Sequence, residues 1–427
     1  MNDNKTILIN HRFFNGIDNH LHENKSIIID NGKILAIEDR IEKPLNSEYR
    51  IIDLKGLTLL PGLIDNHVHL SLPFVHTGNI KVILESKRQI RKNLKCCINT
   101  GVTTVRDAGA VPGWIDYCKS IVKHDITAGP GILTTNSTIT AENGCPDWVQ
   151  YFTHFQKIMA RGEYKESPKT PADAKKLVKK MIDKGADWIK IYYQSKSWSI
   201  KGHKLPVFDN ATFRAIMDTA GEYGKKVCCH VVFLDDLKSA IPMGINSTEH
   251  SIIDSEIPDS IIDDFIQRGI AIHPTLTYLD LMGNKELKRH FYDIVCKKGD
   301  VFLEPESLRQ VKQYYDLHLS ESYPPINGKS PYKFYDDVAL FNQGYPIALK
   351  NLLKLQKAGA KVGVGSDSGG SCMSYFGILY PEELKRMTSA GLTNYEVLKA
   401  ATSVNAEIIG MSDRIGSISK GRIADLV

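Results

Sequence analysis

The sequence lacks the features that mark membrane and nucleic-acid-binding proteins. No stretch of the 427 residues approaches 18 uninterrupted apolar residues, so no membrane-spanning helix is predicted. The first ten residues, MNDNKTILIN, contain no basic segment followed by an apolar core, so no signal peptide is expected. The net charge is only +5, and lysines and arginines are scattered among acids. We therefore expect neither a nucleic acid nor a membrane as a partner.

Cysteine is present without a disulfide or metal-binding pattern. The eight cysteines include two adjacent pairs, Cys96-Cys97 and Cys228-Cys229, and no C-x-x-C motif occurs. Adjacent cysteines are poor disulfide partners for each other. In a long chain of ordinary globular composition, 42% hydrophobic and 24% charged, this usage is typical of reduced intracellular proteins. A cytoplasmic location is the expectation.

Two kinds of organisation follow one another along the chain. The first 58 residues contain short strand-like runs, and the segment DNGK between two of them is a hairpin signal. From residue 59 onward, short apolar runs alternate with stretches of helical periodicity that end in glycine, which indicates βαβ units and a parallel sheet. Eight such runs are present: LLPGLIDNHVHL, GVTTVRDAG, GILTT, DWIKIYY, KVCCHVV, INSTEHS, AIHPTL and KVGVGSDSG.

Eight strands alternating with helices predict an α/β fold, a (β/α)8 TIM-type barrel. We assign residues 59–412 to this barrel. The final residues, GSISKGRIADLV, return to strand-like character, so residues 1–58 and 413–427 are expected to form a small β-sandwich domain that is incomplete at its C-terminal end. The interval 278–361 is too long for a simple crossover. It is predicted to hold at least two helices and a loop, SESYPPINGKSPYKFYDD, which is either a lid or a surface insertion.

Residues with metal-binding chemistry fall at the ends of these runs, where the active site of such a barrel is built. A His-x-His pair alone is a weak signal in a chain with 14 histidines. The pair in the first run gains weight because other ligand types end later runs in order, and together they suit zinc or a similar divalent ion. The six candidates are His67, His69, Lys190, His230, His250 and Asp367.

With these motifs, LLPGLIDNHVHL, WIKIYY, VCCHVV, STEHS and GSDSG among them, the sequence resembles the amidohydrolase superfamily of metal-dependent hydrolases over nearly its whole length. It looks most like the Xaa-Pro dipeptidase-like or imidazolonepropionase-like branch. The resemblance implies a centre of two divalent ions, zinc or manganese. It implies that His67, His69 and Asp367 bind one ion and that His230 and His250 bind the other.

The resemblance also implies that Lys190, carboxylated by CO2, bridges the two ions. An ammonium group cannot ligate a cation, but a neutral lysine can add CO2, and the resulting carbamate is an anionic oxygen donor. Burial and nearby positive charge favour the neutral amine. Hydroxide between two divalent ions would then attack a polarised carbonyl, with Asp367 as the catalytic proton shuttle. The expected reaction is hydrolysis of an amide or peptide-like C–N bond in a small-molecule or dipeptide-like substrate.

The sequence differs from the family pattern at two positions that are expected to line the substrate pocket. Asn143 stands where the dipeptidase-like branch often has histidine, and Val232 replaces a polar residue of the fifth strand. Asn143 and Tyr192 are the predicted substrate contacts, with Glu142 as a further candidate. His203 and His273 are interpreted as structural or peripheral.

Three alternatives stay open at this point: a deaminase-type enzyme with one metal ion, a cyclic-amide hydrolase of the same superfamily, and a non-catalytic scaffold barrel. Lys190 argues against the first, and the complete ligand set argues against the scaffold. The sequence does not determine the oligomeric state, although a homo-oligomer is common among soluble enzymes.

Overall fold

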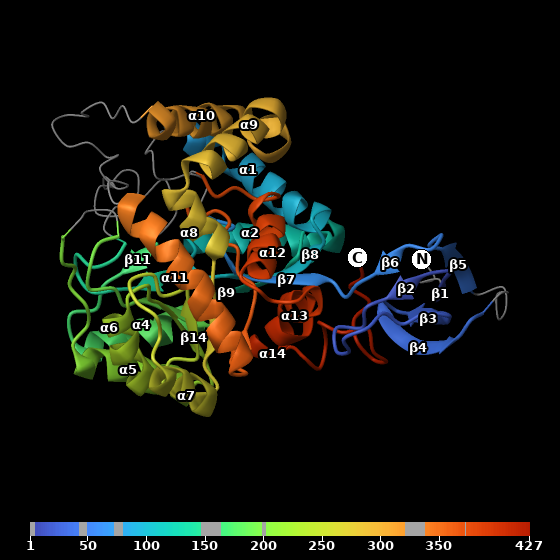
Figure 1. The fold of residues 1–427 in the computed structure, drawn as a ribbon, viewed down its shortest axis with the longest axis horizontal. Coiled ribbons are helices and arrows are strands. Elements are labelled where there is room, and N and C mark those ends of the chain that lie inside the picture. Colours follow the sequence, from blue (N-terminus) through green and yellow to red (C-terminus); the bar gives the residue numbers. More distant parts are fainter. Residues whose placement is uncertain are drawn as a thin grey trace.

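The computed structural model describes residues 5–41, 49–71, 80–146, 164–198, 202–320, 338–371 and 373–427. Two regions are distinguished in Figure 1: a small group of strands that includes β1, and a larger body of strands surrounded by helices, with the C-terminal end of the chain between them.

The small region is built from a four-stranded sheet in the order β4-β3-β1-β5. Its strands are β1 (Lys5–Ile9), β3 (Lys25–Asp30), β4 (Lys33–Asp39) and β5 (Tyr49–Asp53). The predicted hairpin joins β3 to β4, and Asn31 and Gly32 both have positive φ angles there, 49° and 70°, as the tight turn requires. Two shorter strands, β2 (Arg12–Phe13) and β6 (Thr58–Leu59), pair beside this sheet.

The last residues of the chain return to the small region. Ile423 bridges Lys33 of β4, and Leu426 bridges Pro61. The buried Ile418 packs in the same apolar cluster as Leu8. These contacts support assigning residues 413–427 to the small domain, which we keep as a proposal.

The larger region is a parallel barrel, as the sequence predicts. Its third position is shared by two short strands, β9 and β10, which are separated by residues 135–137, where Asn136 has a φ of 56°. At the end of β9, Thr134 O accepts the backbone N–H groups of Asp187 and Trp188, which directly precede β12, and Asn66 N donates to Val364 O at 3.0 Å to close the ring. The barrel strands are β7 (Leu63–Val68), β8 (Val102–Asp107), β9 (Gly131–Thr134), β10 (Thr138–Ile139), β12 (Ile189–Tyr192), β13 (Val227–His230), β14 (Ser247–Glu249), β15 (Ala271–His273) and β16 (Lys361–Val362). The further short strand β11 (Lys165–Glu166) lies beside β10.

The crossover helices show the start and stop signals that the sequence contains. In α4 (Pro171–Asp183) the Thr170 side chain accepts the backbone N–H of Asp173, and in α5 (Asn210–Glu222) Asp209 caps Thr212 in the same way. Other helices around the barrel are α1 (Ile80–Asn99), α2 (Pro112–His124), α6 (Leu234–Ala240), α7 (Asp259–Arg268), α11 (Val338–Lys357), α12 (Leu379–Ser389), α13 (Asn394–Lys399) and α14 (Asn405–Ile408). Within the described ranges, none of the helices combines the length and apolarity needed to span a bilayer.

The long interval after the seventh run contains α8 (Leu276–Gly283), α9 (Lys285–Phe302) and α10 (Pro305–Ser320), which agrees with the expected insertion of helices. Helices α9 and α10 lie next to α1 at one end of the molecule (Figure 1). Tyr315 and Tyr375 join the inserted helices to the segment after Asp367: Tyr315 Oη donates to Met373 O, and Tyr375 Oη donates to Phe291 O. The predicted lid or insertion loop covers residues 320–337, and all of it after Ser320, the last residue of α10, lies outside the described part of the chain.

Candidate metal centre

The six predicted ligands lie in or within five residues after strands of the barrel, and all are buried. His67 belongs to β7 and His69 follows it; His250 and Asp367 follow β14 and β16. Lys190 belongs to β12, and His230 is the last residue of β13. Because the strands are parallel, their C-terminal ends form one rim, and the ligands meet there.

Three of the ligands form a compact set. Ligand atoms of His67, His250 and Asp367 all lie within 4.8 Å of one another. Asp367 Oδ1 lies 3.5 Å from His67 Nε2 and 3.1 Å from His69 Nε2, so His69 is placed beside the same carboxylate. His69 Nδ1 lies 2.8 Å from the carbonyl oxygen of Gly109, which fixes the ring with Nε2 toward Asp367. Four predicted ligands are thus brought together.

His230 lies next to this set but faces a different partner. Its ring centroid is 4.5 Å from that of His250, while its Nε2 atom is 2.5 Å from Gln194 Oε1 and 3.9 Å from Cys145 Sγ. Neither Gln194 nor Cys145 is among the predicted site residues. A polar residue two positions beyond Tyr192 in the strand-end segment is the signal that could have indicated Gln194.

Lys190 is fully buried, and its Nζ atom has no hydrogen-bond partner among the described residues. The centroid of the Tyr192 ring lies 5.4 Å from Nζ. An isolated ammonium group in such a position is costly, because burial removes its water without supplying a partner. The surroundings of Nζ therefore fit a chemically modified Lys190 better than a free ammonium group.

The backbone at two ligands is held in an uncommon conformation. His250 and Asp367 have φ angles of 76° and 57°, in the left-handed region that residues other than glycine rarely adopt. Thr275 shares this feature with a φ of 47°, and its Oγ1 atom lies 2.6 Å from His250 Nδ1. Such strain is concentrated at functional sites, where surrounding contacts hold it in place.

Below the ligands lies a buried ionic network that the sequence analysis did not include. Glu249 Oε2 is 2.8 Å from His67 Nδ1, and Glu249 Oε1 is 2.6 Å from Arg106 Nη2. His273, interpreted as structural, lies 3.3 Å from the same carboxylate. The signal available in the sequence was a glutamate and an arginine inside apolar strand runs, because buried charges are kept only when they are paired.

Burial sets the protonation of the histidines. It lowers the pKa of His67 to about 4, and it lowers the pKa values of His230 and His250 well below the ordinary value. Burial alone would raise the pKa of Asp367, but His67 and His69 outweigh it and lower this pKa to about 2. His67, His230 and His250 thus offer neutral imidazoles and Asp367 an ionised carboxylate, the forms that ligate a cation. Burial alone would lower the pKa of His69, but its contact with Asp367 outweighs burial and raises this pKa, so a bound cation would have to displace a proton from this ring.

Of the predicted substrate contacts, Tyr192 lies at the metal centre, whereas Asn143 and Glu142 lie at the surface. Tyr192 lies at the site: its ring centroid is 4.5 Å from that of His230, and its hydroxyl is 2.8 Å from the hydroxyl of Tyr164. Asn143 is exposed in a turn with a φ of 59°, and Glu142 beside it is also exposed. Trp198, which the sequence analysis did not name, lies 5.0 Å from His230 and 5.6 Å from His250 between ring centroids.

Comparison with known proteins identifies the family. Residues 58–427 match the Amidohydrolase family. The chain belongs to this family. The amidohydrolase assignment made from the HVH, lysine, histidine and GSDSG motifs is confirmed, and so is the barrel fold.

Individual amidohydrolases resemble the chain either locally in sequence or globally in structure. A dihydroorotase of Elusimicrobium minutum (strain Pei191) is 42% identical over 81 residues, which cover 19% of this chain and 16% of that protein. The match therefore spans about a sixth of the length of this relative. A Xaa-Pro dipeptidase with methionine bound in its active site has a TM-score of 0.73 at 21% identity, covering 99% of this chain and 93% of that one. A prolidase complexed with N-methylphosphonate-L-proline has a TM-score of 0.73 at 23% identity, and the match covers 99% of this chain and 92% of that one.

Proposed function

We propose that the protein is a metal-dependent hydrolase that cleaves an amide or peptide-like C–N bond at the rim of the barrel. The observation that carries this proposal is the convergence of ligand atoms from His67, His250 and Asp367 within 4.8 Å. Neutral imidazoles and a carboxylate favour zinc or manganese. His67, His69 and Asp367 would hold one divalent ion, and His230 and His250 would hold a second.

A carbamate on Lys190 would complete this centre. The buried Nζ atom, unpaired among the described residues, supports this modification, because CO2 addition replaces a cation among histidines by an anionic oxygen donor. His230 would exchange its present contact with Gln194 for the second ion. Gln194 is then left at the edge of the site as an amide that can contact the substrate.

The bound ions would supply Lewis-acid activation of water and of the substrate carbonyl. The chain supplies the proton transfer: the ionised Asp367 accepts a proton from water and returns it to the leaving amine. The paired hydroxyls of Tyr164 and Tyr192 lie beside His230 and are suited to donate a hydrogen bond to the substrate. Trp198 covers His230 and His250, and its ring limits the access of bulk water.

Dipeptides and N-acylated amino acids are the first substrate class. The structural likeness to a Xaa-Pro dipeptidase and a prolidase supports this class. Aromatic rings near the second set of ligands, those of Trp198, Tyr278 and Phe341, favour an apolar group on the substrate. Asn143 stays a proposed contact at the exposed end of the loop that leads to Cys145.

A cyclic amide is the second candidate. The local sequence matches to dihydroorotases, among them one of 28% identity over 135 residues in Pediococcus pentosaceus, favour it. Opening of a cyclic amide needs the same water activation and the same proton transfer as peptide hydrolysis. The two classes differ in what the pocket accepts.

The test uses the full chain loaded with zinc or manganese in the presence of bicarbonate. Dipeptides, N-acylated amino acids and cyclic amides including dihydroorotate are offered separately, and release of the amine or ring-opened acid is followed by mass spectrometry. We expect hydrolysis in one class, and loss of it in Asp367→Asn and after removal of metal by a chelator. Hydrolysis that persists in both the variant and the chelated protein would contradict the proposal.

A further inference from the structure

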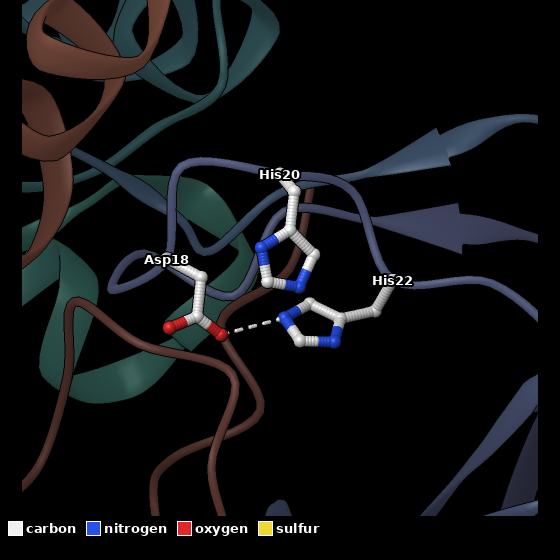
Figure 2. A group of neighbouring side chains, drawn as sticks. All are labelled: Asp18, His20 and His22. Carbon is white, nitrogen blue, oxygen red and sulfur yellow. Dashed lines mark hydrogen bonds and ion pairs between the residues drawn. The ribbon is translucent and has the colours of Figure 1, made fainter.

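A second group of metal-binding side chains lies in the small domain, outside the barrel site. The loop between β2 and β3 reads FNGIDNHLHEN, in which Asp18, His20 and His22 alternate with other residues. One ligand atom from each lies within 4.8 Å of the other two. In Figure 2 the carboxylate and the two rings lie close together on one side of the loop. None of these residues belongs to the proposed catalytic centre.

Two of the three ligands are already at a ligand-to-ligand distance that one ion can span. His22 Nε2 and Asp18 Oδ2 are hydrogen-bonded at 2.9 Å, and an ion bound between them would replace the shared proton. Zinc binds imidazole nitrogen and carboxylate oxygen at about 2.0–2.2 Å, so two ligands of one ion lie roughly 3 Å apart. The ring of His20 is 4.5 Å from that of His22 between centroids and is exposed, so it can turn toward the other two.

The loop holds Asp18 and His22 in position without a metal ion. Asn15 Oδ1 accepts the backbone N–H groups of Ile17 and Asp18, and Asn15 Nδ2 donates to Asp18 Oδ2 at 2.7 Å. His22 exchanges two backbone hydrogen bonds with Phe13, and its ring stacks on the Phe13 ring at 4.9 Å. Both ligands are therefore oriented before binding, which lowers the entropic cost of capturing an ion.

We propose that Asp18, His20 and His22 form a binding site for a divalent transition-metal ion of the zinc class. Two imidazoles and one carboxylate are the ligand types that zinc, cobalt and nickel take, and they are a poor set for calcium or magnesium, which prefer oxygen. Because His20 is exposed, the remaining coordination positions face water. This site is independent of the proposed hydrolase function.

The position of the loop suggests what the ion does. Asn15 O accepts the N–H of Ile418, and Gly16 O accepts the hydroxyl of Ser403 from η6 (Ala400–Val404), the π-helical turn near the end of the barrel. The loop thus contacts both the C-terminal segment and the barrel. An ion held by three side chains of this loop restrains it at the junction of the two regions.

The experiment measures zinc binding to untagged full-length protein by competition with a chelator and by elemental mass spectrometry. Two variants remove ligands, His20→Ala and Asp18→Asn, and His124→Ala removes an exposed histidine elsewhere. All four proteins are first compared by thermal unfolding in excess chelator, so that a loss of folding is recognised. Removing a residue that only orients a ligand typically lowers metal affinity by about 10–100-fold, so losing a ligand should cost at least about 100-fold.

We expect wild type and His124→Ala to bind one more zinc ion per chain than either ligand variant, with the barrel ions unchanged. Cobalt bound to the same proteins should show the matching difference in its visible absorption. Equal zinc content and equal affinity in all four proteins would overturn the proposal. Because the readout is zinc content and not hydrolysis, failure here leaves the proposed function standing, and failure of the hydrolase test leaves this site standing.

Discussion

Glu249 faces His67 from the side opposite Asp367. Its Oε2 atom lies 2.8 Å from His67 Nδ1, while His67 Nε2 lies 3.5 Å from Asp367 Oδ1. A carboxylate at one ring nitrogen fixes the orientation and the tautomer of a metal-binding histidine, leaving the other nitrogen free to ligate. Arg106 holds this carboxylate in turn, at 2.6 Å. The contacts from Arg106 to Glu249 and from Glu249 to His67 therefore connect the interior of the barrel to its proposed metal centre.

Replacing Glu249 by glutamine should weaken metal binding by about 10–100-fold, because His67 loses its orienting carboxylate. The same change leaves the buried Arg106 without its counter-charge and should cost about 3–5 kcal/mol in the free energy of unfolding. Zinc affinity is measured by chelator competition and stability by denaturant unfolding. Glu256→Gln is the control, because Glu256 pairs with Lys350 at the surface. Unchanged zinc affinity in Glu249→Gln would contradict the proposal that Glu249 orients His67 for metal binding.

Lys190→Ala should abolish the two-ion centre. The variant removes the only group proposed to bridge the ions, so metal content at the barrel should fall and hydrolysis should be lost. Added short carboxylic acids should restore part of both, because they can occupy the space of the carbamate. Lys226→Ala, at the start of the neighbouring strand, is the control and should keep wild-type metal content. Full metal binding and activity in Lys190→Ala would show that the lysine does not bridge.

Asp367→Asn should leave the fold intact and much of the metal bound, yet reduce turnover by about 10²–10⁴-fold, the usual contribution of a positioned acid or base. The amide keeps the shape of the side chain but cannot carry the proton. Turnover and metal content are measured on the same preparation, with the surface variant Asp218→Asn as the control. Wild-type turnover by Asp367→Asn would rule out its role as the proton shuttle.

His318, in the inserted helices, should make stability depend on pH. Burial, with a contribution from Lys288, lowers the pKa of His318 from 6.5 to about 3. Between those values the unfolded chain binds a proton that the folded protein does not, so stability falls as the pH drops below 6.5. From pH 7 to pH 5 the loss from this group is about 2 kcal/mol.

The variant that tests this is His318→Phe, which keeps a ring against Tyr314, 4.4 Å away between centroids. Denaturant unfolding at pH 7 and pH 5 should show a smaller loss of stability in the variant than in wild type. The same substitution at the exposed His290 controls for the loss of an imidazole. An identical pH dependence in wild type and His318→Phe would contradict the assignment.

The barrel could be predicted because its signals are local. Each of the eight apolar runs contains a barrel strand, and the glycine that follows each of α4 and α5 takes the left-handed conformation, with φ values of 82° at Gly185 and 64° at Gly224. The order of ligands along the runs likewise follows from strand topology. The split of the third strand into β9 and β10 was not predicted, because the path of residues 135–137 depends on contacts distant in sequence, such as the hydrogen bond from Thr135 N to Asp107 O.

The surroundings of the ligands were harder to predict because they depend on tertiary contacts. Glu249 and Arg106 are 143 positions apart, so the sequence can indicate that each needs a partner but not that the partner of one is the other. Trp198 and Gln194 belong to a loop whose path the sequence does not specify, yet they lie against His230. Asn143 was chosen by its position relative to the family pattern. The structure places it in an exposed turn, whereas Cys145, two residues later, lies against His230.

Metal content per chain is the first measurement to make, because the rim of the barrel is proposed to hold two divalent ions. The measurement is made on untagged His20→Ala protein, so that the proposed loop site does not contribute, after purification without chelators and loading with zinc and bicarbonate. Elemental mass spectrometry should give about two ions per chain, falling sharply in the His20→Ala, Lys190→Ala double variant. One ion per chain would contradict the two-ion centre, and none would contradict metal-dependent hydrolysis altogether.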